Sequence, residues 1–313
     1  FKQKTAYEIM PSLVGSEMCI RDRRYSVLIG VLVVLAWLVP VQADELDLCV
    51  GARPVSLGGS FVAVADDPNA IFLNPAGLVQ MDRAEITVMG ARLFPGIEGD
   101  KLGMGLVGFV LPSGGLGTLG LGVQMFMADR FNKNAFTLSY ARHLMGGLSL
   151  GVNLKGMMWK ADLEPGDPGP TSSGLKVGLD FGLFWRTPWK VRVGAFVRNV
   201  NQPSIANNTS LGGKLPMEIR VGLAYERLGM LVTAELSSKD GVMDLSGGVE
   251  QRFGENFCVY LGGGQYLEKD KGSAKINAGV GYTFWNMHLE YGYMYLLDLP
   301  VGGAHRISFG YRF

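Results

Sequence analysis

The chain has 313 residues, of which 48% are hydrophobic, 18% are charged and 45 are glycine, and its formal net charge is +1. This charge balance argues against a nucleic-acid partner, which needs a concentrated basic surface. The composition is too polar for a bundle of membrane-spanning helices and too rich in glycine for an ordinary soluble domain. The length allows up to two domains, but no linker divides the sequence, so one large domain is expected.

Two segments precede this domain. Residues 1–22 mix acidic, basic and apolar residues without a period, which predicts a non-native leader that takes no part in the fold. Residues 23–43 predict a signal peptide, because basic residues precede an apolar run and Val41 and Ala43 are small residues at a cleavage site. A membrane anchor is the alternative, but about 15 apolar residues broken by Pro40 fall short of the roughly 20 that a bilayer requires.

The exported chain carries two cysteines, Cys49 and Cys258. They could pair, but an exported protein held by disulfides usually carries more of them. The expectation is therefore two unpaired, buried thiols without a function.

From Arg83 onwards, apolar and small or polar residues alternate, which is the period of strands whose two faces meet different environments. In residues 175–185, apolar side chains occupy every odd position, while lysine, glycine and aspartate occupy most even positions. Residues 218–226 and 275–284 repeat this division. About 14 such stretches follow one another, and an even number is usual in bacterial outer-membrane barrels. They begin near residues 83, 101, 116, 133, 147, 174, 189, 217, 230, 242, 256, 273, 287 and 304.

The connections between these stretches alternate between tight turns and longer loops, apart from two short ones at residues 129–132 and 239–241. Short turns at one end and long loops at the other are typical of a transmembrane barrel. The sequence therefore predicts an all-β fold, a transmembrane antiparallel β-barrel over residues 83–313.

A soluble β-sandwich would also alternate, but its polar face would carry many charges and its apolar face would form a bulky core. Here the polar positions are mostly glycine with sparse charges, and aromatic residues lie towards the strand ends, as in an interfacial girdle. The last stretch ends on Phe309, Tyr311 and Phe313 in alternation. A terminal aromatic on such a strand resembles the signal that the outer-membrane assembly machinery recognises.

Residues 44–82, between the signal peptide and the strands, read differently. Asp66 or Asp67 is expected to cap a turn opened by Pro68, and Asn74 to cap a turn opened by Pro75, because each side chain accepts a bond from an otherwise unpaired N–H. Gly58 and Gly59 break an apolar run and let the backbone turn. This segment is expected to be compact, with short helical turns.

The run Gly-Gly-Ser-Phe-Val-Ala-Val-Ala-Asp-Asp followed by Asn-Pro-Ala-Gly-Leu resembles the mature N-terminus of the FadL-like outer-membrane superfamily. That superfamily includes long-chain fatty acid transporters and PorV/PorQ-like proteins. The resemblance implies a hatch that folds into the barrel lumen, and in the transporters a kink in the third strand makes a lateral gap. The implied hatch and gating residues are Gly58, Gly59, Phe61, Asp66, Asp67, Asn69, Asn74, Pro75, Ala76 and Gly77.

If the oily side faces lipid, the charged side chains of the strands face the lumen and include both signs. An ion-selective pore tends to be lined by one sign, so compensating charges that hold a plug are the better interpretation. The predicted lumen network is Arg186, Arg192, Arg198, Glu218, Arg220, Glu226, Glu250, Arg252, Glu290 and Arg306.

The sequence offers little chemistry. His143, His288 and His305 are too scattered for a metal site, and no cofactor motif is present. His288 and Glu290 could form an acid/base pair on the lumen face, but no serine nucleophile motif accompanies them. We therefore expect no enzyme activity, no metal and no cofactor.

Two functions remain open, and both place the protein in the bacterial outer membrane, in contact with its lipid and its assembly machinery. By family resemblance, the first is passive transport of hydrophobic small molecules through a barrel closed by a hatch. The alternative is a PorV/PorQ-like component that shuttles or anchors secreted proteins in type IX secretion.

Overall fold

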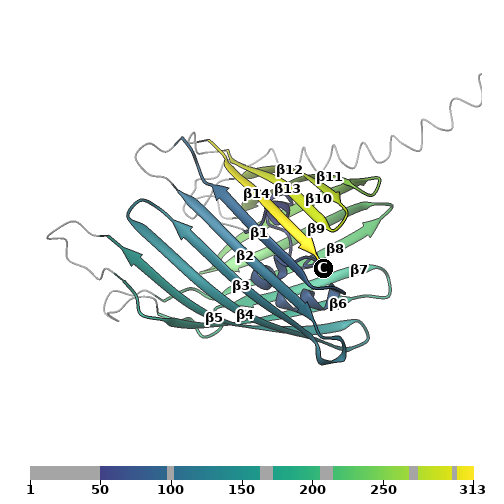
Figure 1. Cartoon of the computed structure of the whole chain (residues 1–313), viewed down its shortest axis with the longest axis horizontal. Coiled ribbons are helices and arrows are strands. Elements are labelled where there is room, and N and C mark those ends of the chain that lie inside the picture. Colours follow the sequence, from purple (N-terminus) through teal and green to yellow (C-terminus); the bar gives the residue numbers. More distant parts are fainter. Residues whose placement is uncertain (1–49, 97–101, 163–171, 205–213, 268–273, 298–301) are drawn as a thin grey trace, which may run out of the picture. The chain divides into compact units, whose positions relative to one another are not determined.

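A computed structural model describes residues 50–96, 102–162, 172–204, 214–267, 274–297 and 302–313. In these ranges fourteen antiparallel strands close into a barrel in which each strand pairs with its sequence neighbours (Figure 1). The strands are β1 (Glu85–Arg92), β2 (Gly103–Pro112), β3 (Thr118–Met127), β4 (Phe131–Met145), β5 (Leu148–Ala161), β6 (Lys176–Arg186), β7 (Val191–Arg198), β8 (Glu218–Arg227), β9 (Met230–Lys239), β10 (Val242–Phe253), β11 (Phe257–Tyr266), β12 (Lys275–Phe284), β13 (Met287–Leu296) and β14 (Ala304–Arg312). The ring closes where β1 pairs with β14, from Glu85 opposite Arg312 to Arg92 opposite His305.

This architecture confirms the all-β class and the antiparallel barrel. Each observed strand begins within two residues of its predicted start. The alternation of apolar and polar residues identifies each strand, whereas it marks the first residue of the strand less clearly. No helix within the described ranges is both long enough and apolar enough to cross a bilayer.

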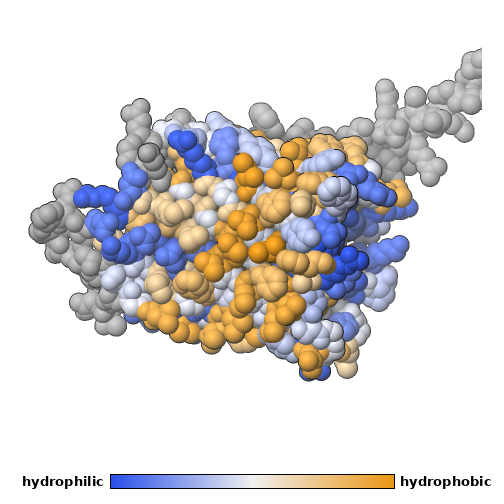
Figure 2. All heavy atoms as spheres, viewed as in Figure 1, coloured by the Kyte–Doolittle hydropathy of each residue, from blue (hydrophilic) through white to orange (hydrophobic). Residues whose placement is uncertain are grey.

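The two faces of the wall differ as the alternation predicts. On β8, Ile219, Val221 and Leu223 are exposed on the outside, while Glu218 and Arg220 are buried on the inside. Figure 2 shows hydrophobic side chains gathered over the middle of β1 to β5, with hydrophilic ones towards the strand ends. An oily outer face around a polar interior is the reverse of a soluble barrel and suits a hydrocarbon environment.

The two ends of the barrel differ in their connections. One end, which we call the turn end, carries the connections 113–117, 146–147, 187–190, 228–229, 254–256 and 285–286. The first of these contains a short 3-10 helix, η2 (Gly114–Leu116). At residues 228–229 both φ angles are positive, 53° at Leu228 and 75° at Gly229, which is the geometry of a two-residue hairpin turn. The opposite end, which we call the loop end, carries the connections from β1 to β2, β5 to β6 and β7 to β8, among others.

Residues 50–82, which we call the plug, pack against the inner wall. They contain α2 (Ala52–Ser56), α3 (Ala70–Leu73) and η1 (Pro75–Gln80), drawn in dark purple and blue within the ring of strands in Figure 1. Every residue from Val50 to Ala65 and from Pro68 to Leu78 is buried. The plug also meets the seam of the barrel, because the Ala52 N–H donates to the Ser308 hydroxyl on β14 at 2.9 Å.

Local chemistry explains most of the plug. The Asn74 carboxamide oxygen accepts from the Ala76 N–H at 3.1 Å, and the Asp67 carboxylate accepts from the Asn69 N–H at 2.8 Å, so both expected caps form. Gly58 and Gly59 have φ angles of 74° and 87°, which turn the chain after α2. The α2 helix itself was not expected from the sequence. Its proline lies in the first turn, where no N–H is required, so the residue that suggests a break fits the helix.

Wall glycines let the plug approach the strands backbone to backbone. A Cβ atom added to Gly248 would lie 2.6 Å from the Leu57 Cα, and one added to Gly194 would lie 2.5 Å from the Val62 carbonyl carbon. Gly151 meets the Pro75–Ala76 peptide in the same way. Such distances leave no room for any side chain, so glycine on the inner face is a packing requirement here.

The third strand shows no break. β3 pairs with β2 from Thr118 to Met127 and with β4 over the same residues, without a shift of register in either ladder. Gly120 and Gly122 in this strand, and Gly117 just before it, therefore do not produce a lateral gap in β3.

Candidate functional site

The plug separates two cavities inside the barrel. The loop-end cavity, of about 380 Å³, is floored by Ile71, Phe72 and Leu73 of the plug. The turn-end cavity, of about 420 Å³, lies against Arg53 and residues 66–69 on the other side of the plug. Together they define the space through which a molecule would have to pass.

At the turn end, one arginine joins the plug to itself and to the wall. Arg53, at the start of α2, contacts the carboxylates of Asp66 at 2.6 Å, Asp67 at 3.0 Å and Glu250 at 2.8 Å. Its side chain is only 8% exposed, and its guanidinium lies 5.5 Å from the centre of the Phe61 ring. Three carboxylates around one buried guanidinium fix α2, the 66–67 turn and β10 relative to one another.

The two plug aspartates respond differently to burial. Burial alone would raise the pKa of Asp66, but the adjacent Arg53 and Arg192 outweigh it and lower that pKa to about 2. Burial, together with the neighbouring charge of Asp66, raises the pKa of Asp67 despite its contact with Arg53. Asp66 is therefore the carboxylate that holds the plug through its charge.

Wall residues extend this cluster. Arg192 contacts Asp66 and Glu226, both at 3.3 Å, while Arg252 contacts Glu226 at 3.1 Å and Glu250 at 2.9 Å. These contacts link β7, β8 and β10 through alternating positive and negative groups. The predicted lumen residues Arg192, Glu226, Glu250 and Arg252 thus lie in one turn-end network with Arg53 at its centre.

A second network clamps the middle of the plug. The Glu235 carboxylate accepts from the backbone N–H groups of Phe61 and Val62, both at 2.9 Å. Arg220 contacts Glu235 at 2.7 Å and donates to the Gly59 carbonyl at 3.3 Å. The turn after α2 is therefore held by a buried ion pair that recognises its backbone.

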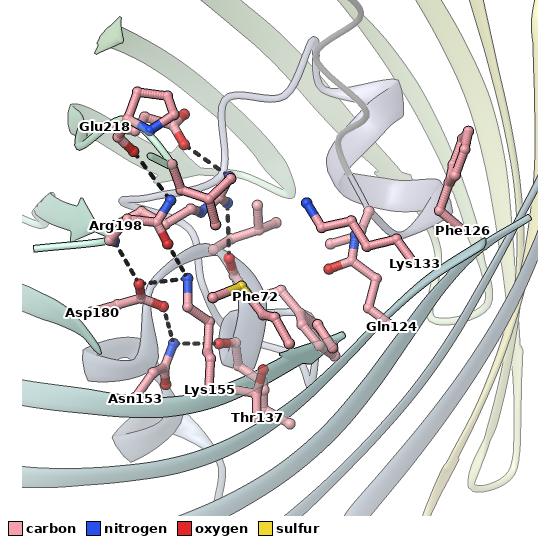
Figure 3. A pocket seen from close by; sticks show the side chains of 18 of the residues that line it. Phe72, Gln124, Phe126, Lys133, Thr137, Asn153, Lys155, Asp180, Arg198 and Glu218 are labelled. Carbon is pink, nitrogen blue, oxygen red and sulfur yellow. Dashed lines mark hydrogen bonds and ion pairs between the residues drawn. The ribbon is translucent and has the colours of Figure 1, made fainter. Parts of the chain in front are cut away.

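A third network lines one side of the loop-end cavity (Figure 3). Lys155 contacts Asp180 at 2.7 Å, and Arg198 contacts Glu218 at 2.8 Å and donates to the Phe72 carbonyl at 3.2 Å. The Asn153 amide donates to the Ile71 carbonyl at 2.9 Å. On this side, β5 to β8 fix the floor of the cavity through its backbone carbonyls.

The opposite side of the loop-end cavity is formed by β2, β3 and β4 and carries a different chemistry. Met104 and Phe126 provide apolar surface there, and the side chains of Lys133 and Gln124 point into the cavity. Neither Lys133 nor Gln124 makes a hydrogen bond or ion pair with any residue that the structure describes.

The remaining predicted residues are distributed as follows. Arg186 donates to the Gln80 side chain at 3.2 Å, and Arg306 is fully buried on the inner face of β14. Glu290 lines the turn-end cavity with His288, whose ring contacts the Thr283 hydroxyl at 2.9 Å. Within the described ranges, no group of His, Cys, Asp and Glu side chains is arranged to hold a metal ion.

The cysteine predictions are resolved only in part. Cys258 is free and partly exposed at the turn-end cavity, so the expectation that it is buried was wrong. Cys258 lies near the start of β11, at the turn end of the barrel. Cys49 lies outside the described residues.

The predicted hatch residues pack within the plug. Phe61, Asn69 and Asn74 are buried, and the Asn74 amide also donates to the carbonyls of Val62 at 2.8 Å and Leu183 on β6 at 3.0 Å. Gly77 lies so close to Ala65 that no side chain fits between them. Pro75 and Ala76 pass against the wall at Gly151.

The aromatic side chains at the end of the last strand point outwards. Phe309 is 42% exposed and Phe313 is 61% exposed, and the Phe313 ring contacts Phe109 and Tyr311 edge to face. Their predicted role in assembly stays a prediction.

Sequence reasoning did not assign a role to Arg53, Lys133 or Gln124. A signal for Arg53 was present, since it is a lone charge in the otherwise apolar and small run from Val50 to Val55. A charge that is buried with its segment needs partners, and the first acidic residues that follow Arg53 along the chain are Asp66 and Asp67. No comparable signal marks the two side chains of β3 and β4.

Comparison with known proteins places the fold. No protein-family model matches the sequence, and no curated protein matches it. Among solved structures, the Ralstonia pickettii toluene transporter TbuX matches with a TM-score of 0.62 at 14% identity, over 84% of this chain and 98% of that one. The Pseudomonas putida toluene transporter TodX matches with a TM-score of 0.66 at 10% identity, over 84% and 98%. A Pseudomonas aeruginosa FadL homologue matches with 0.57 at 13% identity, over 87% and 98%.

The chain is thus a fourteen-stranded β-barrel whose interior is occupied by an N-terminal plug. It has the FadL-like barrel fold, as the motif resemblance in residues 58–78 implied. At these identities the likeness concerns the fold.

Proposed function

We propose that the protein is a passive channel for small hydrophobic molecules in the bacterial outer membrane. The observation that supports this function is the loop-end cavity, whose floor of Ile71, Phe72 and Leu73 belongs to the plug. Its volume of about 380 Å³ lies within the usual range of small-molecule pockets, and its floor is apolar. The similar structures include toluene transporters, which agrees with an apolar cargo.

Passage requires movement of the plug. The floor of the loop-end cavity and the lining of the turn-end cavity belong to one buried segment, and β3 has no break through which a molecule could leave sideways. In the proposed cycle a molecule enters at the loop end, the plug shifts, and the molecule continues past it. No energy source is needed, because the molecule moves down its own gradient.

A reversible lock on the plug tests this function. The hydroxyl oxygens of Ser60 in the plug and Thr233 on β9 lie 2.9 Å apart, so the double variant Ser60→Cys, Thr233→Cys is placed to form a disulfide. It is made in a Cys49→Ser, Cys258→Ser background, so that neither cysteine of the exported chain can pair with the introduced ones. We expect cells with this variant to accumulate labelled toluene faster than cells without it when the pair is reduced. Oxidation should stop the gain, and an uncoupler should have no effect.

The single variant Thr233→Cys in the same background is the control, because it cannot form the lock and should ignore oxidation. Equal uptake by the oxidised and reduced double variant would show that the plug is not the gate. If neither the double variant nor the control accelerates uptake in any redox state, the proposal that the protein is a channel is wrong. The alternative, a barrel that shuttles or anchors secreted proteins, would then be the hypothesis to pursue.

A further inference from the structure

The polar side chains on the two sides of the loop-end cavity differ in whether they have hydrogen-bonding or ionic partners. On the β5 to β8 side, Lys155, Asp180, Arg198 and Glu218 are paired with one another or with the plug. On the β3 and β4 side, Lys133 and Gln124 have no partner in the part of the chain that the structure describes. An ammonium and an amide that share a partly buried cavity without an acceptor are donors available to a ligand.

The electrostatic surroundings select the sign of that ligand. Among the described residues, the charged groups that act on the Lys133 ammonium are Lys239 and Arg198, and both are cations. Arg198 is neutralised by Glu218 at 2.8 Å, whereas no carboxylate of the described residues forms an ion pair with Lys133. An acceptor that reaches Lys133 therefore gains most if it carries a negative charge.

Aromatic residues are the cross-strand neighbours of Lys133. Lys133 lies directly opposite Phe126 on β3 and Trp159 on β5, and all three point to the inner face by the alternation of their strands. The Phe131 ring lies between the rings of Phe126 and Trp159. Its centre is 6.2 Å from the centre of the Phe126 ring and 6.0 Å from the centre of the Trp159 ring, on which it is stacked.

The plug completes the pocket from below. A Cβ atom added to Gly122 would lie 2.6 Å from the Phe72 ring, so this ring covers the wall one step below Gln124. Along the inner face of β3, the order is therefore Phe72 over Gly122, then Gln124, then Phe126. The flat apolar rings of Phe72 and Phe126 therefore lie on either side of Gln124 along this face.

We infer that this side of the cavity binds an aromatic carboxylate, whose carboxylate accepts from Lys133 and Gln124 while its rings stack between Phe72 and Phe126. The inference rests on the proposed function, since it names the class of molecule that the channel selects. Binding requires no covalent step. Aromatic stacking fixes the plane of the ligand, and the two donors fix its direction.

The test measures binding of three probes to the full chain in lipid nanodiscs, corrected with protein-free nanodiscs. 2-Naphthoate carries the rings and the charge, 2-methylnaphthalene carries the rings alone, and laurate carries the charge on an acyl chain. We expect 2-naphthoate to bind about tenfold more tightly than 2-methylnaphthalene, as a charge-assisted hydrogen bond provides, and more tightly than laurate, which has no rings to stack. Lys133→Met should remove the preference over 2-methylnaphthalene, and Gln124→Met should reduce it.

The matched control is Lys160→Met. Lys160 lies at the same end of the barrel, but its side chain is 64% exposed and does not line the cavity. This variant should bind all three probes like the unchanged protein. Equal loss of 2-naphthoate and 2-methylnaphthalene in Lys133→Met would show that the lysine only supports packing, and would overturn the inference. Laurate binding as tight as that of 2-naphthoate would overturn its aromatic part.

The outcomes also separate this inference from the proposed function. Binding of 2-naphthoate that depends on Lys133, without any toluene uptake, would keep the site and remove the channel. Toluene uptake without any preference for the anion would keep the channel and remove the site.

Discussion

The cavity at the turn end and the cavity at the loop end adjoin the same plug, but they use their charged side chains differently. At the turn end, Arg53 is surrounded by three carboxylates at 2.6 to 3.0 Å, and Arg192 and Arg252 extend the cluster to a fourth, Glu226. At the loop end, Lys133 and Gln124 contact no polar partner in the described ranges. Saturated charges hold a segment in place, whereas unsaturated donors are available to bind. Both ends therefore hold the plug, through the Arg53 cluster at the turn end and through Arg198 and Asn153 at the loop end, and the unpaired donors on the β3 and β4 side of the loop end are where we propose that a ligand binds.

Removal of the central guanidinium should disturb the plug most. Arg53→Met leaves Asp66, Asp67 and Glu250 buried without their common partner, and breaking a buried pair costs about 3–5 kcal/mol. We expect fast hydrogen–deuterium exchange in residues 50–82 and unchanged exchange in the strands. Arg227→Met, at an exposed position of the same end, is the control and should leave the plug protected. Protection of the plug in Arg53→Met would show that the turn-end network does not retain it.

A substitution that disturbs the packing of the plug on the wall, away from either cavity, should raise hydrogen exchange of the plug less than the loss of Arg53 does. Gly194→Ala places a Cβ against the Val62 backbone, which cannot rotate away, so about 1–3 kcal/mol of overpacking is expected. Gly90→Ala is the matched control, because a Cβ at that position meets nothing within 4 Å. Exchange of residues 58–65 should rise in the first variant and stay the same in the second. Identical exchange in both would mean that the plug tolerates a displaced backbone.

The cap at Asn74 should contribute less. Asn74→Ala loses the bond to the Ala76 N–H, a loss of about 1 kcal/mol, together with the bonds to Val62 and Leu183. The barrel should remain folded by its migration on unboiled gels, while exchange rises locally in residues 74–80. A barrel that fails to assemble in this variant would make the plug part of the folding core.

Acid should have little effect until the pH is low. The pKa of Asp66 is lowered from 3.8 to about 2, so the stability that this carboxylate contributes is complete above its ordinary pKa and is lost as the pH falls through about 2. We expect the difference in plug protection between the unchanged protein and Asp66→Asn to stay constant from pH 7 to pH 4 and to shrink below that. Asp66→Asn should lack this acid transition. A loss of protection near pH 6 in the unchanged protein would point to another titrating group.

The barrel could be predicted from the sequence because the alternation of apolar and polar residues is local to a strand. In residues 175–185 it is visible without knowing which strands pair with this one. The caps at Asp67 and Asn74 were predictable for the same reason, since each joins residues two positions apart. The network around Arg53 was not predictable, because its contact with Glu250 spans 197 positions and depends on the closed ring.

The two free donors escaped prediction for a different reason. At the start of β4, Asn132 and Asn134 put polar side chains on the outward positions beside Lys133. Polar residues on both faces remove the alternation, so the sequence neither places Lys133 on the inside nor begins the strand at Phe131. The pairing with Phe126 and Trp159 becomes visible only through the register of three strands.

The contact between Ala52 and Ser308 bears on the order in which the protein can assemble. Ser308 belongs to β14, which closes the ring against β1, and its hydroxyl accepts the N–H that opens the first helix of the plug. The bond spans 256 positions, so it cannot form until nearly the whole chain has been made. Seating the start of the plug and closing the cylinder therefore belong to one late step, in which the two ends of the folded region meet on the same strand.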